Sequence, residues 1–83
     1  MSAESHFKPE LEQKDRKVLV QAMLYSEDIN VLIYDATGNL VYNYNNQESG
    51  RFSKTFNLEK LESGKYDITV LTDYFTETSR ITL

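Results

Sequence analysis

The sequence predicts an all-β fold, an antiparallel β-sandwich of six or seven strands. Short runs rich in β-branched and aromatic residues recur along nearly the whole chain, and residues typical of turns separate them. Helical periodicity is weak, because only Leu58 to Glu62 (LEKLE) can form a single helical turn. The spacing of these runs is typical of a sandwich.

Six strands are expected within a domain that spans residues 17–83. They cover Lys17–Leu24, Ile29–Asp35, Asn39–Tyr44, Arg51–Leu58, Lys65–Thr72 and Phe75–Leu83. A seventh strand over Phe7–Glu12 would lie at a sheet edge, because Pro9 has no backbone N–H to donate. The rest of residues 1–16 is expected to be a flexible N-terminal segment.

The segment DATG predicts a hairpin between the second and third strands. Asp35 suits the first position of a type I turn, and Gly38 suits the left-handed residue that follows. The result is a three-residue loop with Asp35 facing Asn39. Because side chains alternate along each strand, the expected pairs are Tyr34 with Leu40, Ile33 with Val41, and Leu32 with Tyr42.

This register makes the hairpin apolar on both faces. The face expected to lie on the core carries Ile29, Val31, Ile33 and Val41. The opposite face is a candidate interaction face formed by Leu32, Tyr34, Leu40, Tyr42 and Tyr44. Two interpretations stay open for it. In the first, the five residues are ordinary strand residues covered by neighbouring segments. In the second, they form a patch that binds a second copy, a neighbouring domain or a sugar.

The clearest alternation follows the turn at Gly64, in the strand that begins at Lys65. Tyr66 is expected to be a corner residue whose hydroxyl bonds to a loop backbone, since buried tyrosines need a hydrogen-bond partner. The predicted core consists of Val18, Val20, Ile29, Val31, Ile33, Val41, Phe56, Leu58, Leu61, Tyr66, Ile68, Val70 and Ile81.

The charge pattern excludes two classes of partner. The net charge is -4, and between Val18 and Gly50 there are four acidic residues and no lysine or arginine. Acidic residues without neighbouring bases repel phosphate, so we expect no binding to nucleic acid or to anionic membranes. These acids are expected to be solvated turn residues, because their spacing fits no calcium loop.

The residues needed for common catalytic sites are missing. The chain has no cysteine, and its one histidine, His6, lies in the polar N-terminal segment. Glu27 and Asp28 are adjacent and would point in different directions, which does not suit a glycosidase pair. We therefore expect a protein that is not an enzyme and that holds no metal or cofactor.

No targeting or membrane segment is recognisable in the chain. The first seventeen residues lack the apolar run of about 7 to 15 residues that a signal peptide contains. No stretch approaches the roughly 20 apolar residues of a membrane-spanning helix. We expect no insertion into a membrane.

Four segments resemble exported immunoglobulin-like β-sandwich domains of Gram-negative bacteria: INVLIYDATGNLVYNY, KTFNLEKL, ESGKYDITV and SRITL. The pattern is most similar to the C-terminal sorting domains of the type IX secretion system and to small secreted relatives of unknown function. The resemblance covers Ile29 to Leu83. Its characteristic positions are Ile33, Tyr34, Asp35, Gly38, Val41, Leu61, Gly64, Tyr66, Ile68 and Val70.

The resemblance implies a secreted, periplasmic or cell-envelope protein with a non-catalytic accessory or sorting role. Its partner would be another protein, a secretion or envelope component, or a second copy of itself. In that mechanism the final strand, Phe75–Leu83, and an exposed sheet edge offer main-chain pairing or a docking surface. The alternative is a glycan- or ligand-binding module in which Tyr34, Tyr42 and Tyr44 stack on a sugar.

Overall fold

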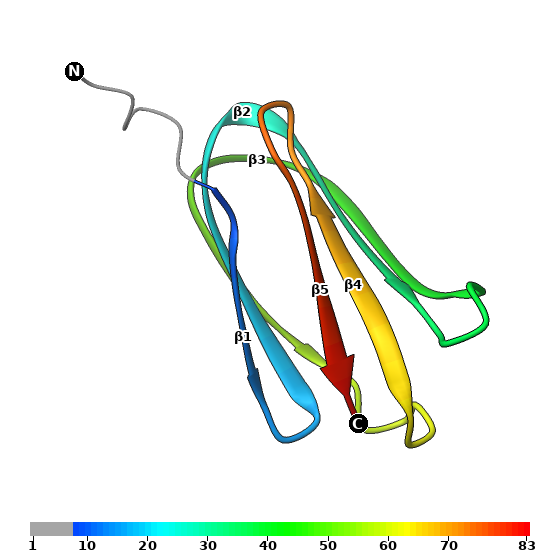
Figure 1. The fold of residues 1–83 in the computed structure, drawn as a ribbon. Coiled ribbons are helices and arrows are strands. Elements are labelled where there is room, and N and C mark those ends of the chain that lie inside the picture. The colour runs from blue at the N-terminus through cyan, green and yellow to red at the C-terminus, as the bar shows by residue number, and fades with distance from the viewer. Residues whose placement is uncertain (1–7) are drawn as a thin grey trace.

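The computed structural model describes residues 8–83, which form one antiparallel sheet of five strands and no helix (Figure 1). The strands are β1 (Glu10–Lys14), β2 (Lys17–Tyr34), β3 (Leu40–Asn57), β4 (Lys65–Leu71) and β5 (Thr76–Thr82). The all-β antiparallel prediction is confirmed, whereas the predicted six or seven strands are five in this part of the chain. His6 and Phe7, and with them the start of the predicted edge strand, lie outside the described residues.

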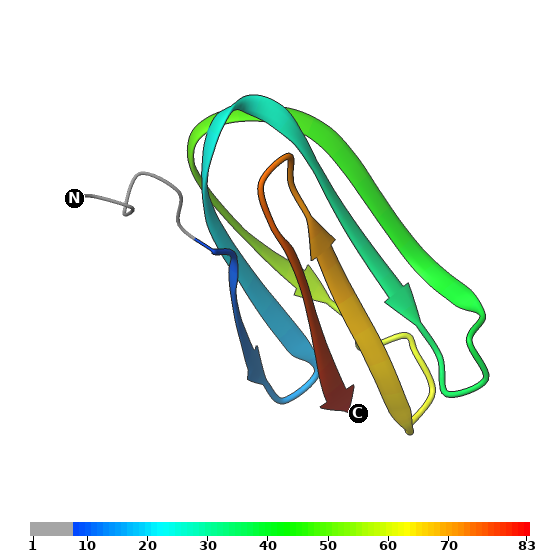
Figure 2. The ribbon, with the colours of Figure 1, turned by 45° about the horizontal axis from the view of Figure 1, so that its top comes forward.

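Strand β2 connects all parts of the sheet. One edge of β2 pairs with β1 over residues 17–21 and with β4 over residues 30–34, and its other edge pairs with β3 along its length. Strand β5 pairs with β4. The sheet curls, so that the strands around β1 and the strands around β5 face each other (Figure 2). Within the described residues, no helix is both long and apolar enough to cross a membrane.

Two arms of this curled sheet meet at a bend in the β2–β3 hairpin. The first arm contains β1, residues 17–24 of β2 and residues 50–57 of β3; the second contains residues 27–34 of β2, residues 40–48 of β3, β4 and β5. The sequence predicted that the chain leaves strand conformation at this bend, once within β2 and once within β3. The structure instead continues β2 and β3 through it, which joins four predicted strands into two.

A β-bulge produces the bend. Tyr25 and Ser26 together lie opposite Ser49, and both Ser26 (φ 57°) and Gly50 (φ 86°) adopt left-handed backbone conformations. The extra residue in β2 changes which side chains face inward, from even-numbered positions before the bend to odd-numbered positions after it. Apolar residues therefore cover the inner face of both arms, although the chain turns sharply between them.

Glu27 is buried at the bend, with 4% of its surface exposed. One carboxylate oxygen accepts the Tyr25 N–H at 2.9 Å, and the other accepts the Asp73 N–H in the β4–β5 turn at 2.8 Å. We call this arrangement the Glu27 bridge. The expectation of a solvated turn residue is wrong for Glu27, because the bulge turns its side chain inward, where backbone donors satisfy it.

The core fills the concave side of the sheet. Val20, Ile33, Ile68 and the other predicted core residues are buried, except that Val41 is 37% exposed and Leu61 is half-buried at the core margin. Three further residues belong to the buried hydrophobic core and were not predicted: Ala22, Leu24 and Phe52.

Loops hold the two arms together at the end opposite the bend. The Tyr66 hydroxyl donates to the Glu62 carbonyl at 2.7 Å, which confirms the predicted corner tyrosine. The Leu58 N–H donates to the Arg16 carbonyl at 2.8 Å, and the Arg16 guanidinium donates to the Leu61 carbonyl. The β3–β4 loop is thereby attached to the β1–β2 turn.

Candidate functional surface

The tip of the β2–β3 hairpin has the predicted turn but a different register beyond it. The Gly38 N–H donates to the Asp35 carbonyl at 3.0 Å, the Asp35 N–H donates to the Asn39 carbonyl at 2.9 Å, and Gly38 has φ 90°. Tyr34 pairs with Leu40 as expected. The next pairs are Ile33 with Tyr42, Leu32 with Asn43, and Val31 with Tyr44.

Val41 is the reason for the change in register. It is the extra residue of a second bulge, so every position of β3 beyond it is shifted by one relative to the predicted pairing. A shift of one residue moves each side chain to the other face of a sheet. The predicted pairs of Ile33 with Val41 and Leu32 with Tyr42 are therefore wrong.

The five residues of the predicted interaction face do not share one face. Leu32 and Tyr34 lie half-buried on the outer face, Leu40 is exposed at the tip, and Tyr42 and Tyr44 lie on the inner face opposite Ile33 and Val31. A flat platform of three tyrosines is not formed, because the bulge separates Tyr34 from the other two.

Tyr42 and Tyr44 close the core along β3 instead. Their rings pack against Phe56 with centroid distances of 5.7 and 5.5 Å in edge-to-face geometry, and Tyr44 also meets Phe52 at 6.2 Å. The Lys54 ammonium lies 5.3 Å from the centre of the Tyr44 ring. These contacts join residues from both halves of β3 across the curl.

A polar group continues this inner row toward the bend. Glu48 accepts a hydrogen bond from the Asn46 amide at 2.6 Å, and the Tyr44 hydroxyl lies 3.4 Å from the same carboxylate oxygen. Glu48 is half-buried, whereas Lys54 is exposed. The inner side of β3 therefore presents an acid before the bend and a base after it.

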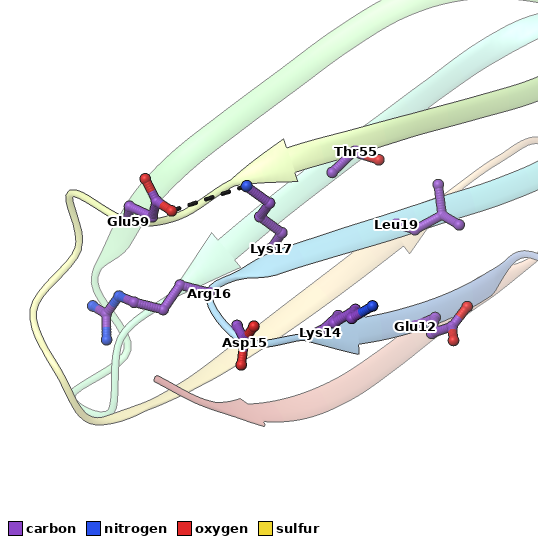
Figure 3. A pocket seen from close by; sticks show the side chains of 8 residues that line it. All are labelled: Glu12, Lys14, Asp15, Arg16, Lys17, Leu19, Thr55 and Glu59. Carbon is purple, nitrogen blue, oxygen red and sulfur yellow. Dashed lines mark ion pairs between the residues drawn. The ribbon is translucent and has the colours of Figure 1, made fainter.

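A hollow of about 460 Å³ lies at the β1–β2 turn, on the first arm (Figure 3). Its lining residues are Glu12, Lys14, Asp15, Arg16, Lys17, Leu19, Thr55 and Glu59. Acidic and basic side chains alternate around it, and Lys17 and Glu59 form an ion pair at 4.0 Å. Because Arg16 donates to a backbone carbonyl and Lys17 is paired, the hollow offers no concentrated charge of one sign for a small ionic ligand.

Asp35 is the one carboxylate at the tip with a lowered pKa. The Thr37 hydroxyl donates to it at 2.7 Å, and the backbone N–H groups of Asn39 and Thr37 each donate at 2.9 Å. These bonds, the Thr37 hydroxyl first, favour the ionised form and hold the pKa of Asp35 below its ordinary value. The carboxylate therefore stabilises the turn.

The outer edges of β1 and β5 are linked by side chains. The Gln13 amide donates to the Thr82 carbonyl at 2.8 Å, and Lys8 forms an ion pair with Glu77 at 3.5 Å. At the end of β5, Leu83 exchanges two backbone hydrogen bonds with Gly64, at 2.8 and 3.0 Å. The final strand is thus fixed at its end, while the outward side chains of Thr76, Thr78 and Arg80 are exposed.

A comparison with protein families identifies the domain. The family described as "Secretion system C-terminal sorting domain" matches residues 14–83, from the end of β1 through β5. The chain belongs to this family. The resemblance to type IX sorting domains inferred from the sequence is confirmed, and sorting domains of this kind occur on proteins exported by that system. No curated protein matches the chain.

The family match encloses the whole of the β2–β3 hairpin and the β4–β5 hairpin. The features described above, the Glu27 bridge, the corner at Tyr66 and the fixed end of β5, therefore all belong to the sorting domain. Within residues 8–83, no three side chains of His, Cys, Asp or Glu gather in an arrangement that could hold a metal ion.

Proposed function

We propose that this chain is a non-catalytic sorting signal that a protein of the type IX secretion machinery recognises. The observation that carries the proposal is the family match over residues 14–83. The curled sheet supports it, because a rigid β-domain with free strand edges presents main-chain and side-chain groups for recognition by another protein. The two facing arms also support assignment to the immunoglobulin-like sandwich class.

We propose that β5 and its outer-face side chains form the recognition surface. Leu83 and Gly64 hold the end of the strand by two backbone hydrogen bonds, so β5 is presented in one geometry. Thr76, Thr78 and Arg80 are exposed along it. Preorganisation of this kind lowers the entropy cost of binding. A glycan-binding role for Tyr34, Tyr42 and Tyr44 stays a prediction that a glycan array would test.

The sorting role is tested by export of a reporter protein fused to the 83-residue chain. We expect the reporter in the medium or on the surface of a host that has the type IX system, and its retention in the same host without that system. A reporter fused to an unrelated β-domain is the control. Equal retention of both reporters in the competent host would contradict the sorting role.

The recognition surface is tested in the same assay with Thr76→Glu and Thr78→Glu combined. Both side chains are exposed, so the fold should persist while export falls at least about tenfold. The matched control is Gln21→Glu with Thr55→Glu, which adds the same charge at exposed positions of the first arm. If both double variants export equally, β5 is not the recognition surface, although the sorting role stands.

A further inference from the structure

Strand β3 is a free edge along its entire length. Within residues 8–83, its only backbone partner is β2, and no strand lies beyond it (Figures 1 and 2). A long unpaired edge is a template for another strand, and proteins usually protect such edges. The strand Leu40–Asn57 is therefore the largest unused pairing surface that the structure describes.

Two features of β3 restrict which strand can be added to it. The strand bends at Gly50, opposite the bulge in β2, so a straight strand can pair with only one arm. Lys54 points to the inner face at an edge, where a charged side chain disfavours unselective pairing. A partner must bend at the same place, and an acidic group of that partner would add an ion pair to the contact that Lys54 makes with Tyr44 of its own chain.

A second copy of this chain satisfies the first requirement. A two-fold axis through Gly50, directed into the concave side of the bend, sets two β3 strands side by side and antiparallel. Both bends then coincide and both inner faces stay on the same side, so the curled sheet continues from one copy into the other. Closed symmetry of this kind uses the same edge of both copies, so assembly through this edge stops at two copies.

The charges along β3 select the register. Paired residues must share a face, so a two-fold antiparallel pair sets one residue opposite its own copy. Near the bend that residue is Ser49, Gly50 or Arg51. Centring on Arg51 opposes two arginines, and centring on Ser49 brings the two Glu48 side chains into diagonal contact. Only centring on Gly50 makes the two bends coincide, and it sets each Glu48 diagonal to Lys54 of the second copy. These two attractions outnumber the one like-charge contact of this register, the diagonal pair of Arg51 side chains on the outer face.

The two halves of β3 are complementary in this register. Residues 40–47 carry no charge and are followed by Glu48, whereas residues 51–57 carry Arg51 and Lys54 and no acid. Antiparallel pairing lays the basic half of one copy along the neutral and acidic half of the other. Lys54 also reaches Tyr44 of the second copy, because Tyr44 and Glu48 flank the position opposite Lys54.

We propose that the chain forms a two-fold dimer by antiparallel pairing of the β3 edges centred on Gly50, with Glu48 of each copy beside Lys54 of the other. This interface is separate from the proposed recognition surface on β5, which stays exposed on both copies. The dimer therefore presents two sorting signals, and it pairs the long edge of β3 that residues 8–83 leave open.

Engineered cysteines test the register, because the chain has none of its own. In the proposed dimer Gln47 lies opposite Ser53 of the second copy, at a Cα distance of about 5 Å, which a disulfide spans. Within one chain both side chains point to the outer face, on opposite sides of the bend at Gly50, so the bend directs them away from each other and only an intermolecular bond can form. We expect Gln47→Cys with Ser53→Cys to oxidise rapidly to a covalent dimer.

The control is Asn43→Cys with Ser53→Cys, which the same register separates by roughly 13 Å between copies. All three positions are exposed, so the variants should fold like the parent chain. Dimer formation by the first pair, at least about tenfold faster than by the control, supports the proposal. Equal rates or no covalent dimer would overturn it.

Charge exchange gives a second test by sedimentation equilibrium of the 83-residue chain. Glu48→Lys and Lys54→Glu should each weaken the dimer about tenfold, because each replaces two diagonal attractions by repulsions. The double variant should recover most of the loss. If the parent chain is monomeric at all concentrations, the proposal is overturned, and the β3 edge would then be available to a strand of another protein. A double variant as weak as the single variants also overturns it.

Discussion

The β2–β3 hairpin contains two bulges that have opposite effects on how well the sequence predicts the structure. At the bend, Tyr25 and Ser26 face Ser49 alone, and the apolar residues on both sides of the bulge stay inside. At the tip, Val41 is the extra residue, and it turns Tyr42 and Tyr44 from the predicted outer face to the inner face. One inserted residue thus preserves a hydrophobic face in one place and exchanges the faces in another.

The difference lies in what each bulge can use for stabilisation. The bend has a buried carboxylate that two backbone N–H groups satisfy, so the bulge is tied to the β4–β5 turn. The tip has no such bridge. Its register depends on the aromatic contacts of Tyr42 and Tyr44 with Phe56, which form only when the sheet curls. The bulge at the bend is held by hydrogen bonds that reach the β4–β5 turn, whereas the bulge at the tip is held by aromatic packing.

Loss of the Glu27 bridge should have the largest effect. Glu27→Ala leaves the N–H groups of Tyr25 and Asp73 without their charged acceptor, and we expect the free energy of unfolding to fall by about 2 to 4 kcal/mol. Denaturant unfolding followed by circular dichroism measures the change. Asp28→Ala, an exposed acid next in the chain, is the control and should change stability by less than about 0.5 kcal/mol. Equal effects of the two variants would refute the bridge.

The register beyond the tip bulge predicts which of Tyr44 and Val41 contributes more to stability, and the order is opposite to the one that simple alternation predicts. Tyr44→Ala should lower the free energy of unfolding by about 2 kcal/mol, because its ring packs on Phe52 and Phe56. Val41→Ala should lower it by less than about 0.5 kcal/mol, since Val41 is exposed. Urea midpoints of the two variants distinguish the registers. The reverse order would restore the pairing of Val41 with Ile33.

The strained backbone of the bend offers a smaller gain. Ser26 has φ 57°, a conformation that costs an L-residue roughly 1 kcal/mol and glycine little. Ser26→Gly should therefore raise the free energy of unfolding by a few tenths of a kcal/mol up to about 1 kcal/mol, after the added entropy of the unfolded chain is subtracted. The converse change, Gly50→Ala at φ 86°, should lower the free energy of unfolding. Thermal unfolding of both variants measures the two changes, and a shift of the same sign for both would contradict the assignment of strain to this bend.

The smallest expected effect is the loss of stability at acid pH that arises from Asp35 at the hairpin tip. The pKa of Asp35 is lower in the folded chain than its unfolded value of about 3.9, so its contribution to stability is present above that value and is lost as pH falls through the folded pKa. Asp35→Asn should remove this part of the acid dependence. The melting temperatures of both proteins from pH 5 to pH 2 measure it, and parallel curves would contradict the expectation.

Local patterns in the sequence were sufficient for several features. The turn at Asp35 and Gly38, the corner hydroxyl of Tyr66 and the alternation of Ile68 and Val70 follow from residue preferences within a few positions. The bend was not predictable in this way, because residues 25–28 contain the polar residues typical of a strand end. A change from even to odd apolar positions across Ser26 was the available signal for a bulge within one strand.

The sequence by itself determined the all-β class, the family resemblance and most of the core, because these depend on side-chain type and on the two-residue period of strands. The tertiary structure decided where the bulges lie, and therefore which face Tyr42 and Tyr44 occupy. It also decided that Glu27 is buried and that β3 has no partner strand other than β2 in the described part of the chain. These features depend on contacts between residues far apart in the chain, whose energies no local pattern contains.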